Sequence, residues 1–208
     1  KGGFYHSGQV CVSVQLVFVP RAELPDFAAE LAEGAEALTV GDPTKAETQC
    51  GPLIRPAEVD RVASWVDAAV QGGARLAAGG KRMGSTLYQP TVLVDPPCDA
   101  DVSQKEVFGP VVCIYGYDDV DAAITQANAL PYAFQAAVFT DRMSWADYCV
   151  ETLAASAVMV NDHTAFRVDW MPFAGRRQSG LGTGGIGYTM ADMSEEKMVV
   201  VNAPSSVR

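Results

Sequence analysis

Cys11 is the residue best suited to nucleophilic chemistry. It lies in SGQVCVSVQLVFVP, residues 7–20, after a polar turn containing Gly8 and directly before an alternating apolar run. Free cysteine is among the most buried residue types, so packing at the start of a strand is the ordinary expectation. A thiol at a strand end that faces a cleft would instead have backbone amides nearby, which favour the thiolate. The residues alone leave both interpretations open, with His6 as a base for the second.

Glu106 and Phe108 form a second candidate pair in KEVFGPVV, residues 105–112. A Gly-Pro pair before a strand predicts a turn, and most charged turn residues are simply solvated. A rigid turn that carries an acid two residues before an aromatic ring could also bind ribose hydroxyls with the carboxylate, while the ring covers a flat base. Both interpretations of this turn stay open at this point.

A third candidate region is VNDHTAFRVDWMPFAG, residues 160–175, which lies between a predicted strand and a glycine-rich loop. Aromatic side chains and a cation on one loop are typical of a binding-site mouth, although they also occur as a loop's own packing. Ligand sites favour loops carried by a rigid scaffold. The candidate substrate-binding residues here are His163, Phe166, Arg167 and Phe173, with Trp170 nearby.

The glycine loop GLGTGG, Gly180–Gly185, matches the G-x-G-x-x-G spacing of dinucleotide-binding loops. That spacing has a physical meaning only where it joins a strand directly to a helix whose amino terminus faces the pyrophosphate. PFAGRRQS precedes it here in place of an apolar strand, and no strand ending in an acid follows at the needed distance. We therefore interpret these glycines as residues that permit close backbone approach or positive φ.

Composition excludes several classes of function. The chain of 208 residues has a formal net charge of −10 and a pI near 4.6, which oppose unspecific attraction to nucleic acid or to anionic membranes. No stretch approaches the ~20 uninterrupted apolar residues of a membrane span. The five cysteines form no CxxC pair and are odd in number, which fits neither a disulfide framework nor a zinc site. Reduced thiols in a cytoplasm, with no bound metal, are expected.

Predicted strands and helices alternate along the chain. Strands are expected at 12–19, 91–95, 111–117, 136–141, 157–161 and 197–202, and helices at 27–38, 59–70, 118–130 and 143–153. This order predicts an α/β fold in which helices cover both faces of a mostly parallel, twisted sheet. One domain is expected, and its last strand projects to pair with another chain.

The motifs occur in one order. SGQVC precedes a strand, VGDP and GPLI follow, and KEVFGPVV, AVFTD and VMVN come before PFAGRRQSGLGTGG and a terminal EKMVVV. Together they closely resemble the catalytic domain of the NAD(P)-dependent aldehyde dehydrogenase superfamily, over essentially the whole chain. The combination of GQVC with EVFGP is specific to this resemblance.

The resemblance implies roles for three residues. Cys11 matches the cysteine that attacks the aldehyde carbonyl to give a thiohemiacetal. Hydride then passes to the nicotinamide, and water removes the thioester that remains. The backbone N–H of Cys11 is expected to help stabilise the oxyanion. Glu106 matches the acid that binds the nicotinamide ribose, and Phe108 matches the aromatic residue beside the nicotinamide ring. NAD or NADP is the cofactor implied for the full-length enzyme.

The resemblance also implies parts that this sequence lacks. Full-length members place a nucleotide-binding domain before the catalytic domain, so the deacylating base and the second oxyanion donor are expected upstream of Lys1. We expect residues 1–195 to be the catalytic domain of a longer enzyme, and residues 196–208 to be a terminal oligomerisation strand and tail. The isolated chain is expected to bind no cofactor and to be inactive in aldehyde oxidation.

Substrate class and assembly are implied in the same way. The loop SGLGTGGIGYTM has no acidic residue before Asp192, which is similar to the branch that acts on small aldehydes with a phosphate or hydroxyl substituent. Arg167 and His163 would meet that group through charge-assisted hydrogen bonds. The full-length protein is expected to be a cytoplasmic homo-oligomer, either a dimer or a tetramer.

Two other functions stay open. In a cysteine acyl-transfer hydrolase, Cys11 would be the nucleophile with His6 or His163 as base, although no Cys-His-Asn signature is present. In a non-catalytic assembly domain, the chain would serve mainly to pair through 197–202. The EVFGP motif would have no purpose in the hydrolase. The presence of both Cys11 and Glu106 argues against a purely structural role.

Overall fold

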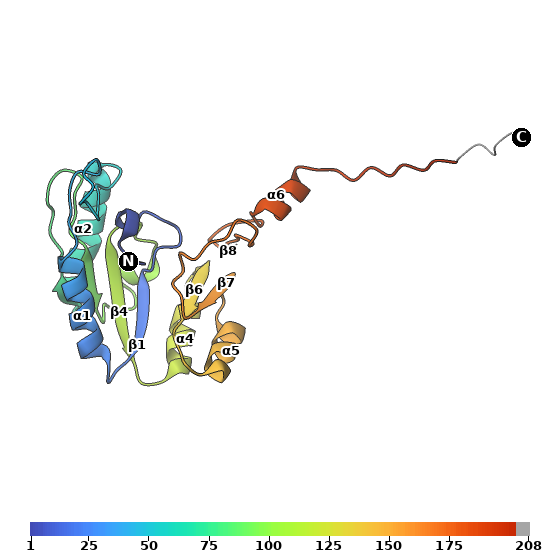
Figure 1. Ribbon diagram of the computed structural model, residues 1–208. Coiled ribbons are helices and arrows are strands. Elements are labelled where there is room, and N and C mark those ends of the chain that lie inside the picture. The colour runs from blue at the N-terminus through green and yellow to red at the C-terminus, as the bar shows by residue number, and fades with distance from the viewer. Residues whose placement is uncertain (203–208) are drawn as a thin grey trace, which may run out of the picture.

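The computed structural model describes residues 1–202, and its largest sheet has four strands (Figure 1). The strands, in spatial order, are β1 (Leu16–Pro20), β4 (Val111–Tyr117), β3 (Thr91–Val94) and β2 (Arg75–Ala78). β1 is parallel to β4 and β4 is parallel to β3, whereas β2 is antiparallel to β3. The predicted α/β fold with a mainly parallel sheet is confirmed.

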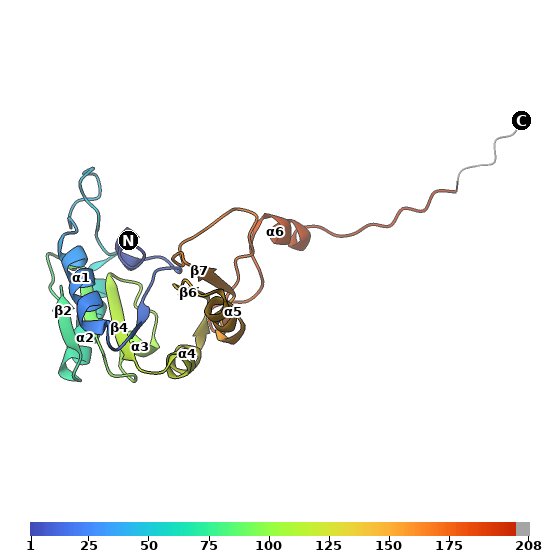
Figure 2. The same ribbon diagram turned by 60° about the horizontal axis from the view of Figure 1, so that its bottom comes forward.

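Helices cover both faces of this sheet, as predicted. α1 (Leu24–Glu36) lies on one face, and α2 (Pro56–Gln71) lies on the other together with the short α3 (Asp101–Gln104) (Figures 1 and 2). Because successive residues of a strand point to opposite faces, Ile114 packs with α1 and Cys113 packs with α2. Both side chains are fully buried, so the two faces of this sheet carry the hydrophobic core.

Turn and capping residues explain where the helices begin and end. Pro56 occupies the first turn of α2, where its missing N–H leaves no intrahelical bond unmade. The helix ends before Gly72, and Gly73 has a φ of 110°, which confirms the predicted closure at this glycine pair. Asp119 caps α4 (Val120–Asn128), because its carboxylate accepts a hydrogen bond from Asp121 N over 3.2 Å.

The last third of the chain forms two smaller sheets. Its elements are β5 (Tyr132–Ala133), β6 (Gln135–Val138), α5 (Met143–Thr152), β7 (Ala157–Val160), β8 (Arg176–Arg177) and α6 (Ile186–Asp192). β6 and β7 pair in parallel, and β5 pairs antiparallel with β8. The strands predicted at 136–141 and 157–161 are therefore present, but they form a sheet of their own and do not extend the four-stranded one.

The strand that follows Cys11 is shorter than predicted. The alternation at 12–19 predicts a strand from its first residue, but β1 begins only at Leu16. Ser13 N donates to Val10 O over 2.9 Å, and Val14 N donates to Gly2 O over 3.1 Å. The first bond closes a local turn and the second joins Val14 to the N-terminal segment, so neither N–H group is available for pairing with β4.

The buried face of α1 also differs from the prediction. Helical spacing predicts a face that starts at Phe27, but the buried residues are Leu24, Ala28 and Ala35, and Phe27 is 39% exposed. The helix begins three residues earlier than expected, because Leu24 already packs in the cluster that contains Val19 and Ile114.

Residues 196–202 form no strand with the other described residues. They extend away from the domain beyond α6 in both views (Figures 1 and 2). The predicted strand 197–202 is thus unpaired within the single chain, and its pairing with a second chain stays a prediction. The rest of the predicted tail, 203–208, lies outside the described residues.

The described part of the chain has neither a metal-binding cluster nor a helix that could cross a membrane. Residues 1–202 contain no group of three or more His, Cys, Asp and Glu side chains placed to hold a metal ion. Within the same residues, no helix has both the length and the apolar character needed to cross a membrane. All five cysteines are free thiols: Cys11 and Cys98 are exposed, and Cys50, Cys113 and Cys149 are buried.

Candidate active site

Cys11 lies in a tight turn between a 3-10 helix, Tyr5–Gly8, and β1. The hydrogen bond from Ser13 N to Val10 O closes this turn over 2.9 Å. The thiol is exposed, and in residues 1–202 no group accepts a hydrogen bond from the Cys11 backbone N–H. The side chain is therefore presented at the entrance to β1, which favours a nucleophile over a packed core residue.

The backbone that leads into Cys11 is strained. His6 and Ser7 have φ values of 48° and 57°, in the left-handed region that costs non-glycine residues roughly 1–2 kcal/mol each. Ser7 Oγ donates to Gly51 O over 2.7 Å, and the Cys50 thiol lies 3.4 Å from the same hydroxyl. These buried contacts hold a conformation that the local sequence would not adopt alone.

Gln9 joins the turn to the loop that precedes α2. Its side-chain nitrogen donates to Pro52 O over 3.1 Å, and its side-chain oxygen accepts from Ile54 N over 2.9 Å. Both ends of one amide are thus satisfied by one backbone segment. The contact fixes the position of the residue that stands two places before Cys11.

The EVFGP turn touches the cysteine turn through two glycines. A Cβ on Gly8 would overlap with the carbonyl oxygen of Gly109, so the two backbones lie closer together than any side chain at Gly8 would allow. Gly8 also has a φ of 71°, which glycine adopts at little cost. This approach holds the segment that contains Glu106 and Phe108 against the segment that contains Cys11.

Gln15, which is four residues after Cys11, also connects the segment that contains Cys11 to the segment that contains Glu106 and Phe108. Its Nε2 donates to Val102 O over 2.9 Å and to Lys105 O over 2.7 Å, and its Oε1 accepts from Val107 N over 2.8 Å. Glu106 stands between the last two partners. A single side chain next to β1 therefore fixes the backbone on both sides of the predicted ribose-binding acid.

Glu106 and Phe108 are both exposed, while the residue between them is buried. Phe108 is 43% exposed and has a φ of 48°, an uncommon conformation for an aromatic residue. Arg61 Nη2 donates to Val107 O over 2.6 Å and helps to hold this backbone in place. The turn thus presents a carboxylate and an aromatic ring to solvent from a fixed support.

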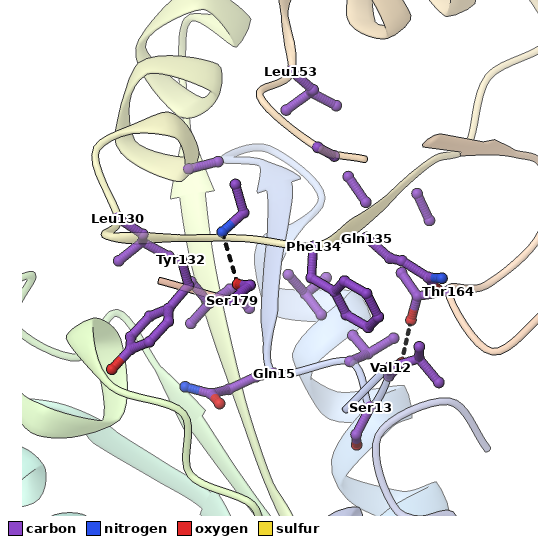
Figure 3. Close-up of a pocket in the computed structure, with 18 of the residues that line it drawn as sticks. Val12, Ser13, Gln15, Leu130, Tyr132, Phe134, Gln135, Leu153, Thr164 and Ser179 are labelled. Atoms are coloured by element: carbon purple, nitrogen blue, oxygen red, sulfur yellow. Dashed lines mark hydrogen bonds between the residues drawn. The ribbon is translucent and has the colours of Figure 1, made fainter. Parts of the chain in front are cut away.

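One cavity of about 1240 Å³ brings most of the predicted site residues together. Figure 3 shows other residues of its lining, among them Gln15 and Thr164. Its lining includes Cys11, Glu106, Phe108, His163 and Phe173. They come from the turn before β1, the loop before β4 and the loops after β7. The cavity therefore places the candidate nucleophile, the candidate cofactor residues and two candidate substrate residues around one space.

The loop after β7 is attached directly to the cysteine turn. Thr164 Oγ1 donates to Val12 O over 2.5 Å, and the Thr164 side chain is buried (Figure 3). Next to it, His163 Nδ1 accepts from Ala165 N over 3.1 Å. This bond occupies one ring nitrogen of His163, so only Nε2 is available to a ligand.

Phe166 and Arg167 do not line the cavity. Phe166 is 48% exposed. The Arg167 guanidinium lies 4.7 Å from the ring centroid of Phe173, and its Nη1 donates to Met171 O over 3.3 Å. Arg167 thus reaches the cavity only indirectly, through the aromatic residue on which it stacks.

The glycine loop lines the same cavity. Gly180, Gly182 and Gly185 have φ values of 153°, 74° and 120°, as expected for residues that permit positive φ. Phe173 and Gly184 exchange two backbone hydrogen bonds of 2.8 and 2.9 Å, which close the loop on itself. No apolar strand runs into it. The short strand β8, which precedes the loop by two residues, consists of two exposed arginines, and α6 follows Gly185. The loop is thus a wall of the cavity and does not join a buried apolar strand directly to a helix.

Two further groups near Cys11 have raised pKa values. Burial raises the pKa of the Cys50 thiol more than its contact with Ser7 lowers it. Burial, and to a smaller extent the charge of a Cys11 thiolate, raises the pKa of Tyr5. Both groups therefore stay protonated at neutral pH, and neither is a base for the exposed thiol.

Sequence reasoning missed three residues that position the candidate site: Gln9, Gln15 and Thr164. Gln15 carried a weak signal, since it is a polar residue within an apolar alternating run. Gln9 and Thr164 act on backbone atoms that lie 43 and 152 positions away in the chain. No local pattern reveals such partners.

Comparisons with known proteins agree on one family. A sequence model described as the aldehyde dehydrogenase family matches residues 1–199. Among curated proteins, 3-sulfolactaldehyde dehydrogenase of Priestia aryabhattai is 40% identical over 199 residues, which cover 96% of this chain and 42% of that protein. Lactaldehyde dehydrogenase of Methanococcus aeolicus is 35% identical over 202 residues, which cover 97% of this chain and 43% of that protein.

Solved structures give the same result. Aldehyde dehydrogenase 21 of Physcomitrella patens, in complex with the reaction product succinate, has a TM-score of 0.92 and 33% identity, and the match covers 99% of this chain and 43% of that one. The NADP-dependent glyceraldehyde-3-phosphate dehydrogenase of Bacillus halodurans, complexed with NADP, has a TM-score of 0.91 and 34% identity, over 97% of this chain and 42% of that one. The chain thus spans about two fifths of the length of these proteins.

Proposed function

Because the chain belongs to the aldehyde dehydrogenase family, we propose that it supplies the nucleophile and parts of the cofactor and substrate sites of an NAD(P)-dependent aldehyde dehydrogenase. One observation carries the proposal. The exposed Cys11 stands on a turn that direct contacts hold against the Glu106–Phe108 turn, and the two turns line one cavity.

In the proposed reaction, the Cys11 sulfur attacks the aldehyde carbon. A C–S bond forms and the carbonyl oxygen becomes an oxyanion, to which the Cys11 backbone N–H donates. The thiohemiacetal carbon then loses a hydride and becomes a thioester. Water adds to the thioester, the C–S bond breaks, and the carboxylic acid and the thiol are released. The exposed position of the thiol and its unpartnered N–H support this role.

The residues of the EVFGP turn fit a nicotinamide nucleotide. The Glu106 carboxylate is exposed at the cavity and can accept hydrogen bonds from ribose hydroxyls, and Phe108 offers a half-exposed ring at the same wall. When bound, NAD or NADP supplies the hydride acceptor. The chain's own part is to hold this acid and ring beside Cys11, through Gln15 and the contact of Gly8 with Gly109.

We propose a small aldehyde with a hydroxyl and an anionic group as substrate. Two similar proteins are named for 3-sulfolactaldehyde and glyceraldehyde 3-phosphate, which carry both groups, and a third is named for lactaldehyde, which carries the hydroxyl alone. These names support the class. His163 and Phe173 line the cavity, and Arg167 stacks on Phe173. In this proposal, Arg167 attracts the anionic end of the substrate, and Phe166 flanks the entrance.

The function is tested in the full-length protein with a matched pair of cysteine variants. Cys11→Ser should lower aldehyde oxidation by at least about 10⁴-fold, because loss of a nucleophile removes the covalent route. Cys98→Ser replaces the other exposed cysteine, which does not line the cavity, and should leave the rate unchanged. Retained activity in Cys11→Ser, or an equal loss in Cys98→Ser, would refute the proposal.

The substrate class has its own test. In the full-length protein, Arg167→Ala should raise the KM for glyceraldehyde 3-phosphate about tenfold or more, and the KM for neutral glyceraldehyde far less. Arg142→Ala removes an exposed arginine that stacks on Trp145, and serves as the control. Equal effects of Arg167→Ala on both aldehydes would remove the argument for an anionic substrate.

The two alternatives make different predictions. A hydrolase would need His163 or His6 as base, but His6 does not line the cavity and Nδ1 of His163 accepts from a backbone N–H. An assembly domain needs no reactive thiol. Iodoacetamide should therefore alkylate Cys11 faster than Cys98, and full-length protein should bind NAD or NADP. We also expect the 208 residues alone to reduce neither cofactor with an aldehyde above a Cys11→Ala control.

A further inference from the structure

Two buried side chains from distant parts of the chain meet beside the turn that carries Cys11. The Cys50 thiol donates a hydrogen bond to Ser7 Oγ over 3.4 Å, and Ser7 Oγ donates to Gly51 O over 2.7 Å. Ser7 is 2% exposed, and Cys50 is completely buried. These three groups join the cysteine turn to residues 50–51, and we call them the latch.

The Cys50 end of the latch is fixed by its surroundings. Cys50 N donates to Thr39 O over 3.0 Å, and Cys50 O accepts from Gly41 N over 3.1 Å. Segments with buried side chains and paired backbone groups open rarely. Cys50 is therefore a firm point to which a neighbouring side chain can be attached.

The Ser7 end needs such a support. Ser7 and His6 have φ values of 57° and 48°, in a region that residues other than glycine rarely adopt. Such a backbone persists only where neighbouring groups hold it. Within residues 1–202, Ser7 is the only residue of the 3-10 helix Tyr5–Gly8 whose side chain forms a hydrogen bond. Its hydroxyl is therefore the side-chain contact that holds this strained stretch.

Few residues separate the latch from the nucleophile. Cys11 follows Ser7 by four positions, and between them the side chain of Gln9 is attached to the same loop, residues 50–54. Both attachments thus lead to one loop. The position of the Cys11 thiol and of its backbone N–H therefore follows the position of that loop.

We propose that Ser7 and Cys50 are positioning residues for Cys11, and that the latch holds the thiol and its backbone N–H in the geometry that attack on the aldehyde requires. This inference rests on the proposed function of Cys11. Neither Ser7 nor Cys50 lines the cavity, so both act through the turn. A displacement of about 1 Å at the reacting groups costs roughly 10²-fold in rate, so a small shift of this turn has a large effect.

The state of the Cys50 thiol fits a donor and not a redox partner. Burial raises the pKa of this thiol more than its contact with Ser7 lowers it. The thiol is therefore protonated at neutral pH and can donate to the Ser7 hydroxyl, whereas disulfide exchange needs a thiolate. A disulfide between Cys11 and Cys50 in full-length protein treated with hydrogen peroxide would contradict the donor role and overturn the proposal.

The first test is Ser7→Ala in the full-length protein, with glyceraldehyde 3-phosphate as the aldehyde. The variant keeps the Cβ atom but removes the hydroxyl that joins Cys50 to Gly51. The kcat should fall about tenfold or more, and the KM values for aldehyde and cofactor should change less than about threefold, because the misplaced groups act mainly in the transition state. An unchanged kcat, or a loss that appears only in KM, would overturn the proposal.

Ser7→Gly separates the hydroxyl from the backbone strain. Glycine adopts a φ near that of Ser7 at little cost, so this variant loses the hydroxyl without keeping a strained side chain. It also provides a second measurement where Ser7→Ala folds poorly. We expect Ser7→Gly to lower kcat to a similar extent as Ser7→Ala. A Ser7→Gly protein with full kcat would show that the hydroxyl has no positioning role.

A pair of Cys50 variants tests the other end of the latch. Cys50→Ala removes the donor to Ser7 and should lower kcat severalfold, whereas Cys50→Ser keeps a donor and should retain most of the activity. Cys113→Ala is the control, because it removes an equally buried thiol that contacts Val102 O and not the cysteine turn. It should leave kcat unchanged. Equal losses in Cys50→Ala and Cys113→Ala would assign the effect to packing and refute the role of Cys50.

Failure of this inference differs from failure of the proposed function. If Cys11→Ser retains activity, the nucleophile is wrong and the latch loses its purpose. If Cys11→Ser is inactive while both Ser7 variants keep the original kcat, the nucleophile stands and the latch alone is refuted. Alkylation of Cys11 by iodoacetamide should change less than about threefold in Ser7→Gly, because that reaction needs an exposed thiol and no placed oxyanion donor. Loss of alkylation together with kcat would instead show that the thiol has become buried, and would overturn the proposed positioning role.

Discussion

The four-stranded region, residues 1–117, and the C-terminal region, residues 130–202, differ sharply in burial. Both hydrophobic clusters belong to the first, where Leu93 and Ile114 are completely buried. In the second, every residue of β6 is half-buried, and Met159 is the only buried residue of β7. Local stability follows such contacts. The first region is therefore a rigid support, and the second is a weaker one.

The candidate site draws on both regions, and it uses them differently. Cys11, Glu106 and Phe108 are attached to the four-stranded region by Gln15 and by the approach of two glycines. His163 and Phe173 belong to the C-terminal region. In the proposed enzyme, the groups that need fixed geometry for bond formation thus stand on the rigid region. The groups that contact the variable part of the substrate stand on loops of the other.

The largest expected effect concerns stability. Leu93→Ala should lower the free energy of unfolding by about 2–5 kcal/mol, because it opens a cavity in a fully packed core. Leu153→Ala makes the same change at a half-buried residue of the C-terminal region that lines the cavity, and should cost the 208-residue chain less than about 1.5 kcal/mol. Urea unfolding of both variants measures the difference. Similar losses would show that the two regions are equally well packed.

The second prediction concerns alkaline pH. Burial raises the pKa of the Cys113 thiol to about 12, whereas an unfolded thiol titrates near ~8.5. The folded state holds this proton more tightly, so the stability it contributes is complete below ~pH 8.5 and is lost as the pH rises toward 12. The free energy of unfolding should fall by about 1.4 kcal/mol per pH unit within that window.

Two variants relate this slope to the two regions. Cys113→Ala should make the free energy of unfolding fall less steeply with pH, although the lost packing also lowers that free energy at every pH. Burial and, less, the charge of Asp121 raise the pKa of the Cys149 thiol, which lies in α5. Cys149→Ala should therefore change the slope in the same direction but by less. Unfolding curves between pH 8 and 11 measure all three slopes, and a larger effect of Cys149→Ala would contradict the comparison.

The sequence predicts the four-stranded region better than the C-terminal one, for a physical reason. Strands at 91–95 and 111–117 are continuous apolar runs, because both of their faces are buried. The strands predicted at 136–141 and 157–161 are also present, but no pattern shows that they form a separate sheet. Sheet membership depends on which edges meet, and that information does not reside in one strand.

The candidate site divides in the same way. The GQVC and EVFGP motifs identify Cys11, Glu106 and Phe108, and all three residues line one cavity. The prediction could not show that Arg167 stacks on Phe173 outside the cavity lining, since residue type and neighbourhood do not fix the direction of a long side chain. It also could not show the left-handed backbone of His6 and Ser7, which distant contacts hold in place.

The third prediction tests the attachment of the cofactor turn. In the full-length protein, Gln15→Leu removes three hydrogen bonds to the backbone around Glu106, and should raise the KM for the nicotinamide cofactor about tenfold. The KM for the aldehyde should change far less, because Gln15 acts as a positioning residue for the cofactor turn. Gln126→Leu removes a surface amide that contacts Cys98, and serves as the control. An equal rise in both KM values would indicate general damage to the fold.

The smallest effect is expected at the contact between the two regions. Thr164→Val in the full-length protein removes the hydrogen bond to Val12 O and should raise the KM for the aldehyde severalfold, while the KM for the nicotinamide cofactor stays unchanged. Thr164→Ser keeps the hydroxyl and should restore the original value. This pattern is the reverse of that expected for Gln15→Leu, because Thr164 attaches the substrate loop and Gln15 attaches the cofactor turn. If both variants raised the same KM, the two regions would not divide the site between cofactor and substrate.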